Sequence, residues 1–105
     1  NLSNNDMVFF QDMIETFIRT TEEGVSLLEL QLKEKDFAQM SETAHRISSP
    51  CKHIAAMSLY NDLKEIELIC KKECDIKRVT ELVYSIQKES AQIISAIRNE
   101  QIENV

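Results

Sequence analysis

The residues best suited to chemistry in this chain of 105 residues are two histidines eight positions apart, His45 and His53. Arg46 and Lys52 lie between them, and no carboxylate occurs from residue 43 to residue 61. The chain as a whole is acidic, with a formal net charge of -6. A neutral imidazole is a competent nucleophile near pH 7, because its unperturbed pKa is about 6.5. This locally cationic window therefore indicates a place where a small anion such as phosphate sits beside a reactive ring.

The expected position of His45 on a helix leaves its ring open to a partner. Successive helical residues advance by about 100°, so Ala44 and Ile47 point toward the core while His45 stands at the edge of the apolar stripe or beyond it. Its neighbours within about 60° are mostly small or charged: Ser41, Glu42, Ser48, Ser49 and Lys52. Small hydroxyl side chains do not cover the ring, and Lys52 or Arg46 would offset the charge of a phosphoryl group on it.

The elements that must position this ring are helices, because apolar residues recur with helical spacing along the whole chain. A single glycine and a single proline leave little room for hairpins. Five amphipathic segments are expected: about residues 5–20, 20–35, 36 through at least 47, 56–72 and 76–101. Short connections between such helices predict one domain over residues 1–105, an all-α antiparallel up-and-down bundle.

Three local signals set the expected helix ends. Thr20 to Glu23 is typical of a capping box that starts a helix, although the first two segments could equally form one long bent helix. Asp36 is the expected N-cap of the helix that contains His45. Pro50 either kinks that helix or ends it, in which case Ser49 caps a restart.

The composition argues against several functions. There is no lysine and arginine cluster of the kind that binds a nucleic-acid backbone, and no apolar run approaches the roughly 20 residues that span a bilayer. No glycine-rich phosphate loop is present, so we expect no ATP binding of the usual kind and no autonomous catalysis. Three cysteines (Cys51, Cys70 and Cys74) favour free thiols in a reducing, cytoplasmic setting. Because the chain starts at Asn1, we expect it to be a piece of a longer protein.

Part of the chain resembles a known family. The matching residues are Ala44-His45-Arg46-Ile47, then Ile54-Ala55-Ala56, then Leu59, Leu63 and Ile66-Glu67. This run is similar to the signature of histidine-containing phosphotransfer (HPt) domains. The resemblance implies a four-helix bundle with an additional N-terminal helix, and an exposed His45 that shuttles phosphate between aspartates of receiver domains. It also implies a monomeric module, commonly the C-terminal part of a hybrid sensor histidine kinase that can be anchored in the inner membrane.

The sequence departs from that family at several positions. The family's lysine three residues after the histidine is Ser48 here, and the glycine after it is Ser49. The later glycine is Ala55, and Pro50 is not part of the pattern. We therefore expect phosphate stabilisation or receiver docking to involve a set of residues around His45: Arg46, Ser48, Ser49, Lys52 and His53.

The remaining expectations concern partners and alternatives. Apolar residues near the rim are expected to contact the receiver: Met7, Phe9, Ile54 and Met57. Any Mg²⁺ would belong to the receiver, and the domain itself would need no cofactor. Two alternatives stay open: a degenerate bundle that acts as a non-phosphorylated adaptor, and a small metal-binding domain that uses Cys70 and Cys74 with His53 or Cys51.

Overall fold

The structure, a computed structural model, describes residues 4–53, 56–72 and 75–103 of the chain. These residues form four helices: α1 (Asn4–Glu34), α2 (Phe37–His53), α3 (Met57–Lys71) and α4 (Ile76–Glu103). Within the described ranges there is no β-strand. The expectation of an all-α bundle is confirmed.

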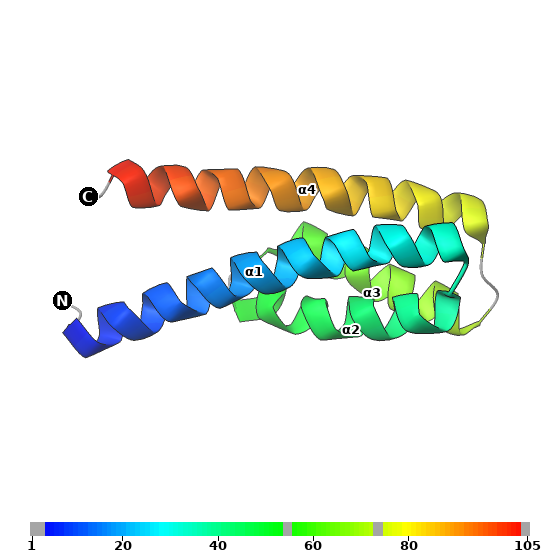
Figure 1. The fold of residues 1–105 in the computed structure, drawn as a ribbon, viewed down its shortest axis with the longest axis horizontal. Helices are drawn as coiled ribbons and strands as arrows, with labels where there is room; N and C mark the ends of the chain where they lie inside the picture. Colours follow the sequence, from blue (N-terminus) through cyan, green and yellow to red (C-terminus); the bar gives the residue numbers. More distant parts are fainter. Residues whose placement is uncertain (1–3, 54–55, 73–74, 104–105) are drawn as a thin grey trace.

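The four helices form a ring in which each packs against its neighbours in the chain. Helix α1 contacts α2 and α4, while α3 contacts α2 and α4 on the opposite side (Figure 1). Neighbouring helices run in opposite directions, which gives a rod of 49 × 20 × 20 Å. With 31 and 28 residues, α1 and α4 are much longer than α2 and α3. They extend past the shorter pair at the end where both termini lie (Figure 1).

Helix α1 is continuous where the sequence suggested two segments. The expected capping box from Thr20 to Glu23 lies inside this helix, and so does Gly24. Gly24 is buried, and a Cβ atom at this position would clash with Cγ2 of Ile47 on α2. The glycine therefore lets α1 and α2 approach closely and does not end a helix. The additional N-terminal helix is the first half of α1 rather than an element of its own.

The turn between α1 and α2 is fixed by hydrogen bonds at both helix ends. Lys35 has a left-handed φ of 56°. The N–H of Asp36 donates to the carbonyl of Gln31 at 2.9 Å, and the N–H of Lys35 donates to that of Leu32 at 3.1 Å, a Schellman arrangement. Oδ1 of Asp36 then accepts from the N–H of Gln39 at 3.3 Å, which confirms the predicted N-cap. This two-residue turn makes α2 antiparallel to α1.

Pro50 lies inside α2, which continues to His53. Of the two alternatives at this proline, the one in which the helix stops and restarts with Ser49 as its cap is therefore wrong. Proline has no N–H, so the carbonyl of Arg46 lacks its usual helical donor. The loss is confined to the last turn, and His45 lies on an uninterrupted helix about two turns before its end.

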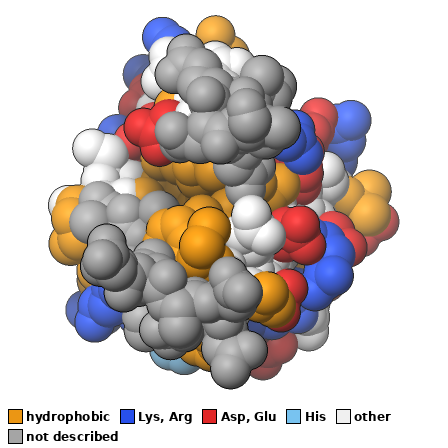
Figure 2. Space-filling model, turned by 90° about the vertical axis from the view of Figure 1, so that its left-hand side faces the viewer, with side chains coloured by type: hydrophobic (Ala, Val, Ile, Leu, Met, Phe, Trp, Pro, Cys, Tyr) orange, Lys and Arg blue, Asp and Glu red, His pale blue; other side chains and the backbone are white. Residues whose placement is uncertain are grey.

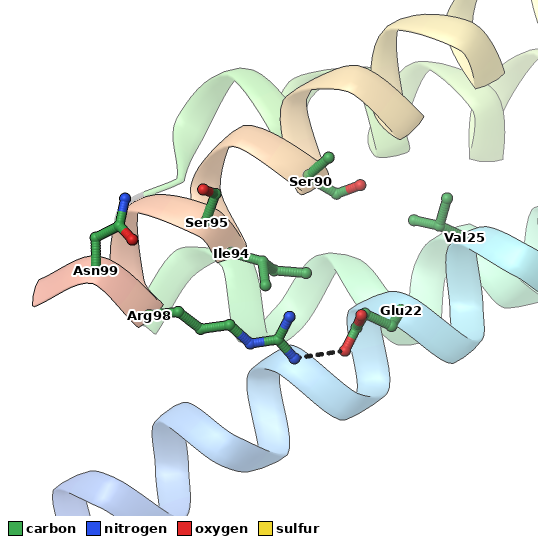
Figure 3. A pocket seen from close by; sticks show the side chains of 8 residues that line it. Glu22, Val25, Ser90, Ile94, Ser95, Arg98 and Asn99 are labelled. Carbon is green, nitrogen blue, oxygen red and sulfur yellow. Dashed lines mark hydrogen bonds and ion pairs between the residues drawn. The ribbon is translucent and has the colours of Figure 1, made fainter. Parts of the chain in front are cut away.

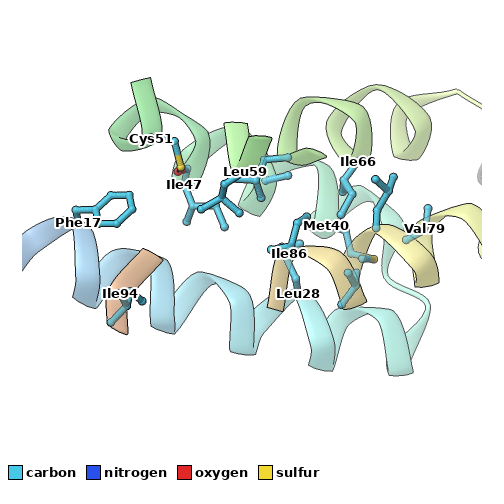
Figure 4. Close-up of a cluster of buried hydrophobic side chains, with 14 of the residues drawn as sticks. Phe17, Leu28, Met40, Ile47, Cys51, Leu59, Ile66, Val79, Ile86 and Ile94 are labelled. Carbon is cyan, nitrogen blue, oxygen red and sulfur yellow. The ribbon is translucent and has the colours of Figure 1, made fainter. Parts of the chain in front are cut away.

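The core is a column of apolar side chains along the axis of the bundle (Figure 4). Helix α2 contributes its predicted stripe, including Met40, Ala44 and Ile47. Helix α4 buries Val79, Leu82, Val83, Ile86 and Ile94. Ser90 is buried among them, and its hydroxyl donates to the carbonyl of Gln87 at 3.1 Å. Phe10, in the first half of α1, does not belong to this column, because 49% of it is exposed.

Candidate functional site

His45 stands on the outer face of α2, as the helical spacing predicts. Its side chain is 63% exposed, whereas Ala44 is fully buried and Ile47 nearly so. Because the helix is anchored in the core on its other face, the ring is presented to solvent by a stiff support.

A carboxylate from the neighbouring helix holds one edge of the ring. Nδ1 of His45 lies 2.9 Å from Oε1 of Glu67 on α3, and the side chain of Glu67 is only 9% exposed. Two lysines of α3 contact the same carboxylate. Nζ of Lys64 donates to Oε2 at 3.0 Å, and Nζ of Lys71 lies 3.5 Å from Oε1. The hydroxyl of Ser41 donates to the backbone carbonyl of Glu67 at 3.0 Å, which ties α2 to α3 at this level.

The charge of Glu67 decides how the ring is oriented. Burial raises the pKa of this carboxyl, but the hydrogen bond and charge of Lys64, together with those of His45, outweigh burial and lower it. Glu67 is therefore ionised at neutral pH and can only accept hydrogen bonds. In the neutral ring, Nδ1 then has the proton and Nε2 keeps its lone pair on the opposite edge. An exposed imidazole held in this tautomer is suited to nucleophilic attack through Nε2.

Ser48 was expected on the phosphate-stabilising or docking surface, and the structure contradicts this. The residue is 1% exposed, and its hydroxyl donates to the backbone carbonyl of His45 at 2.8 Å. Ser41, also expected beside the ring, is buried as well. The apolar stripe of α2 is wide enough to include both hydroxyl residues, and their side chains satisfy carbonyls of the bundle instead of contacting solvent.

The other predicted residues are partly where the sequence placed them. Arg46, Ser49 and Lys52 are exposed. Nζ of Lys52 lies 5.1 Å from the centroid of the Tyr60 ring, over which Lys64 also lies at 5.9 Å. The side chain of His53 and all of residues 54–55 lie outside the part of the chain that can be described, so their predicted roles have no structural account.

A groove lies between α1 and the last turns of α2. Its volume is about 480 Å³, and Ser49, one turn after His45, lies on its α2 wall. Mainly apolar side chains of α1 complete it beside Pro50, and the full lining is Phe9, Asp12, Met13, Thr16, Phe17, Ser49 and Pro50. We refer to this set as the α1–α2 groove. The sequence analysis identified Phe9 as a contact residue but missed Met13 and Pro50.

Apolar side chains are also exposed beyond the groove. Met7, Val8 and Phe9 are between 50% and 72% exposed, and Met57 at the start of α3 is 49% exposed. Figure 2 views the molecule from the end where the termini lie and shows hydrophobic side chains in the middle of that face. Met7, Phe9 and Met57 are thus accessible, as the docking hypothesis requires.

A second hollow lies between α1 and α4, on a different side of the bundle from the α2–α3 face with His45 (Figure 3). Its lining includes Arg98 and Glu22, which form an ion pair at 3.2 Å, and small side chains such as Ser90 and Ser95. It shares no lining residue with the α1–α2 groove.

Two of the three cysteines can be placed in the fold. Cys51 is buried and its thiol donates to the carbonyl of Ile47 at 3.4 Å; burial raises the pKa of this thiol to about 11. Cys70 is partly buried against the core, and Cys74 lies outside the described residues. Among the described residues, no three His, Cys, Asp or Glu side chains are grouped closely enough to hold a metal ion. No helix of the described ranges is long and apolar enough to cross a membrane.

Fold and site together define an all-α bundle that presents one carboxylate-held histidine on an outer face. The model of the Hpt domain family matches residues 12–100. The chain therefore belongs to the Hpt domain family, whose members act as phosphotransfer intermediates in two-component signalling and interact with response-regulator receivers. The resemblance inferred from the residues around His45 is confirmed. No curated protein and no solved structure matches the chain.

Proposed function

We propose that this domain is a phosphorelay intermediate that exchanges a phosphoryl group between His45 and aspartates of receiver domains. The observation that supports this proposal best is the pairing of an exposed imidazole with a buried, ionised Glu67. A histidine with only a surface role would need no such partner from another helix.

The proposed reaction uses the two ring nitrogens differently. Nδ1–H stays hydrogen-bonded to Glu67 while the lone pair of Nε2 attacks the phosphorus of an aspartyl phosphate. An N–P bond forms, the bond between phosphorus and the aspartate oxygen breaks, and the aspartate leaves as a carboxylate. In the reverse or onward step, an incoming aspartate oxygen attacks phosphorus. The ring then leaves with the electrons of the N–P bond as a neutral imidazole, because Nδ1 has kept its proton.

The domain has the role of a carrier between two partners rather than of an enzyme. We propose that the receiver supplies the Mg²⁺ and that this chain contributes no cofactor of its own. The α1–α2 groove is the proposed docking surface, because it is apolar, accessible and one turn from His45. Burial of Phe9 and Met13 by a receiver would bring its aspartate over the exposed edge of the ring.

The test is transfer from a phosphorylated receiver to the purified domain, followed on gels with labelled phosphate. The wild type should gain acid-labile, alkali-stable label, and His45→Gln should gain none. His53→Gln is the matched control, since it removes the other histidine and should keep the label. Label that persists in His45→Gln would mean that another residue carries the phosphoryl group and would overturn the role of His45. Failure of every receiver of the same organism to transfer would favour the adaptor alternative.

A further inference from the structure

Two lysines of α3 bind the carboxylate of Glu67, and they differ in how firmly they are held. Lys64 donates to Oε2 at 3.0 Å, is 36% exposed and also lies over the ring of Tyr60. Lys71 lies 3.5 Å from Oε1 and is 63% exposed. Oε1 is the same oxygen that His45 contacts at 2.9 Å, so Lys71 and the imidazole are neighbours on one atom.

The local charges leave one of these lysines in excess. Glu67 has one negative charge, and Lys64 alone is enough to neutralise it. Lys71 therefore adds a second positive charge at the carboxylate that holds the ring. A phosphoryl group on the ring would bring a charge of about -1.5 to -2 and three acceptor oxygens. The strongest available partner for those oxygens is a nearby cation that is weakly held and free to move.

The other cations near the ring are less well placed. Lys52 lies seven residues after His45 on α2, about 10 Å along the helix axis, and is directed at Tyr60. Lys64 is held by both Glu67 and Tyr60, and its departure would leave the buried carboxylate without its closest cation. Lys71 can leave Glu67 at small cost, because its own side chain is 63% exposed, its nitrogen lies as far as 3.5 Å from Oε1, and Lys64 stays on the buried carboxylate.

We propose that Lys71 is the positioning cation of the phosphorylated state: it moves from Oε1 of Glu67 to an oxygen of the phosphoryl group on Nε2 of His45. The inference rests on the proposed function, because it assigns a role in the same reaction. Lys71 stabilises phosphohistidine relative to free His45, while Lys64 keeps Glu67 ionised and Glu67 keeps the proton on Nδ1. The positive charge that stabilises the phosphoryl group on His45 of α2 thus comes from Lys71 on the neighbouring helix α3.

The test uses chemical phosphorylation by phosphoramidate, so that no receiver is needed. Phosphoramidate transfers its phosphoryl group to an imidazole nitrogen and releases ammonia. The ³¹P resonance of the wild type that is missing in His45→Gln reports phosphorylated His45. Its pH titration is compared among wild type, Lys71→Gln, Lys71→Arg and the control Lys33→Gln. Lys33 forms an ion pair with Glu29 of the same spacing, far from the histidines in sequence.

We expect Lys71→Gln to move the midpoint of this titration up by about 0.5 pH unit, since an exposed cation stabilises the dianion by a factor of about three. Lys71→Arg should restore most of the shift, and Lys33→Gln should leave it unchanged. With a cognate receiver, Lys71→Gln should move the transfer equilibrium toward the receiver by the same factor.

The outcomes separate this inference from the proposed function. A His45-dependent resonance whose titration is identical in wild type and Lys71→Gln would overturn the role of Lys71 and leave the phosphorelay proposal intact. An equal shift in Lys33→Gln would also overturn it, because the effect would then reflect net charge. Absence of any His45-dependent resonance in the wild type would overturn both, since the ring would not be an accessible nucleophile.

Discussion

Removal of the carboxylate beneath the ring should slow phosphoryl transfer without removing the acceptor. In Glu67→Ala, the Nδ1–H of His45 loses a charge-assisted acceptor at 2.9 Å. Such hydrogen bonds contribute about 1.5–3 kcal/mol, but the ring is 63% exposed and water replaces part of the interaction. We therefore work with about 1–1.5 kcal/mol, which corresponds to a transfer rate about tenfold lower. Glu67→Gln keeps a neutral acceptor and should lose only about threefold.

Two measurements check this effect of Glu67. Rapid-quench transfer from a phosphorylated receiver gives the rate, and ¹⁵N chemical shifts of the ring give the share of molecules with the proton on Nδ1. That share should fall in Glu67→Ala and stay close to the wild-type value in Glu67→Gln. Glu29→Ala is the control, since Glu29 is an exposed glutamate that pairs with Lys33 and Gln87 on another side of the bundle. An unchanged rate together with an unchanged tautomer in Glu67→Ala would refute the reasoning.

Three further predictions concern packing, pH and docking. Gly24→Ala should lower the free energy of unfolding by about 1–2 kcal/mol in urea titrations, because the clash with Ile47 exceeds the gain in helix propensity. Burial and the nearby Asp62 raise the pKa of Glu89 to about 7, so the folded protein holds this proton more tightly than the unfolded chain. The contribution of Glu89 to the free energy of unfolding should therefore be highest below about pH 4.5 and fall by about 1–2 kcal/mol as the pH rises toward 7, after allowance for the solvent exposure of this residue. Glu89→Gln should remove this pH dependence of the free energy of unfolding. Phe9→Ser should weaken receiver binding about tenfold in calorimetry and leave the melting temperature unchanged, since Phe9 is 72% exposed; normal affinity would argue against the α1–α2 groove as the docking surface.

The sequence predicted helical features well where the residues that determine a feature are close together in the sequence. The N-cap at Asp36 and the core-facing side of α2, with Ala44 and Ile47, are examples, because capping and amphipathic spacing are properties of a single helix. Whether one or two helices precede Lys35 could not be decided from the sequence, for the opposite reason. Gly24 is required by its close approach to Ile47, 23 residues later in the sequence, and no pattern within α1 predicts that contact.

In the site, too, features set by neighbouring residues could be predicted, and contacts between helices could not. His45 could be found from its cationic surroundings, and its exposure follows from one helical stripe. The role of Glu67 could not be found in this way, because the contact joins residues 22 apart and depends on how α3 lies against α2. One signal was available: Glu67 is a charged residue next to Ile66 in the buried stripe of α3, and a buried carboxylate requires a partner. Ser48 was misplaced because an angle of about 60° from His45 still falls within the buried face.

The position of Ser48 also accounts for how this chain departs from its family. A lysine at that position would have to extend from a site that is 1% exposed, in a helix packed closely against its neighbours. The hydroxyl of Ser48 instead donates to the carbonyl of His45. Helix α2 therefore has a small buried side chain at this position, where the family has a lysine. Lys64 and Lys71 on α3 provide positive charge at the same ring through Glu67. If Lys71 follows the phosphoryl group as proposed, a serine at position 48 is compatible with efficient transfer, and the departure does not by itself indicate a degenerate domain.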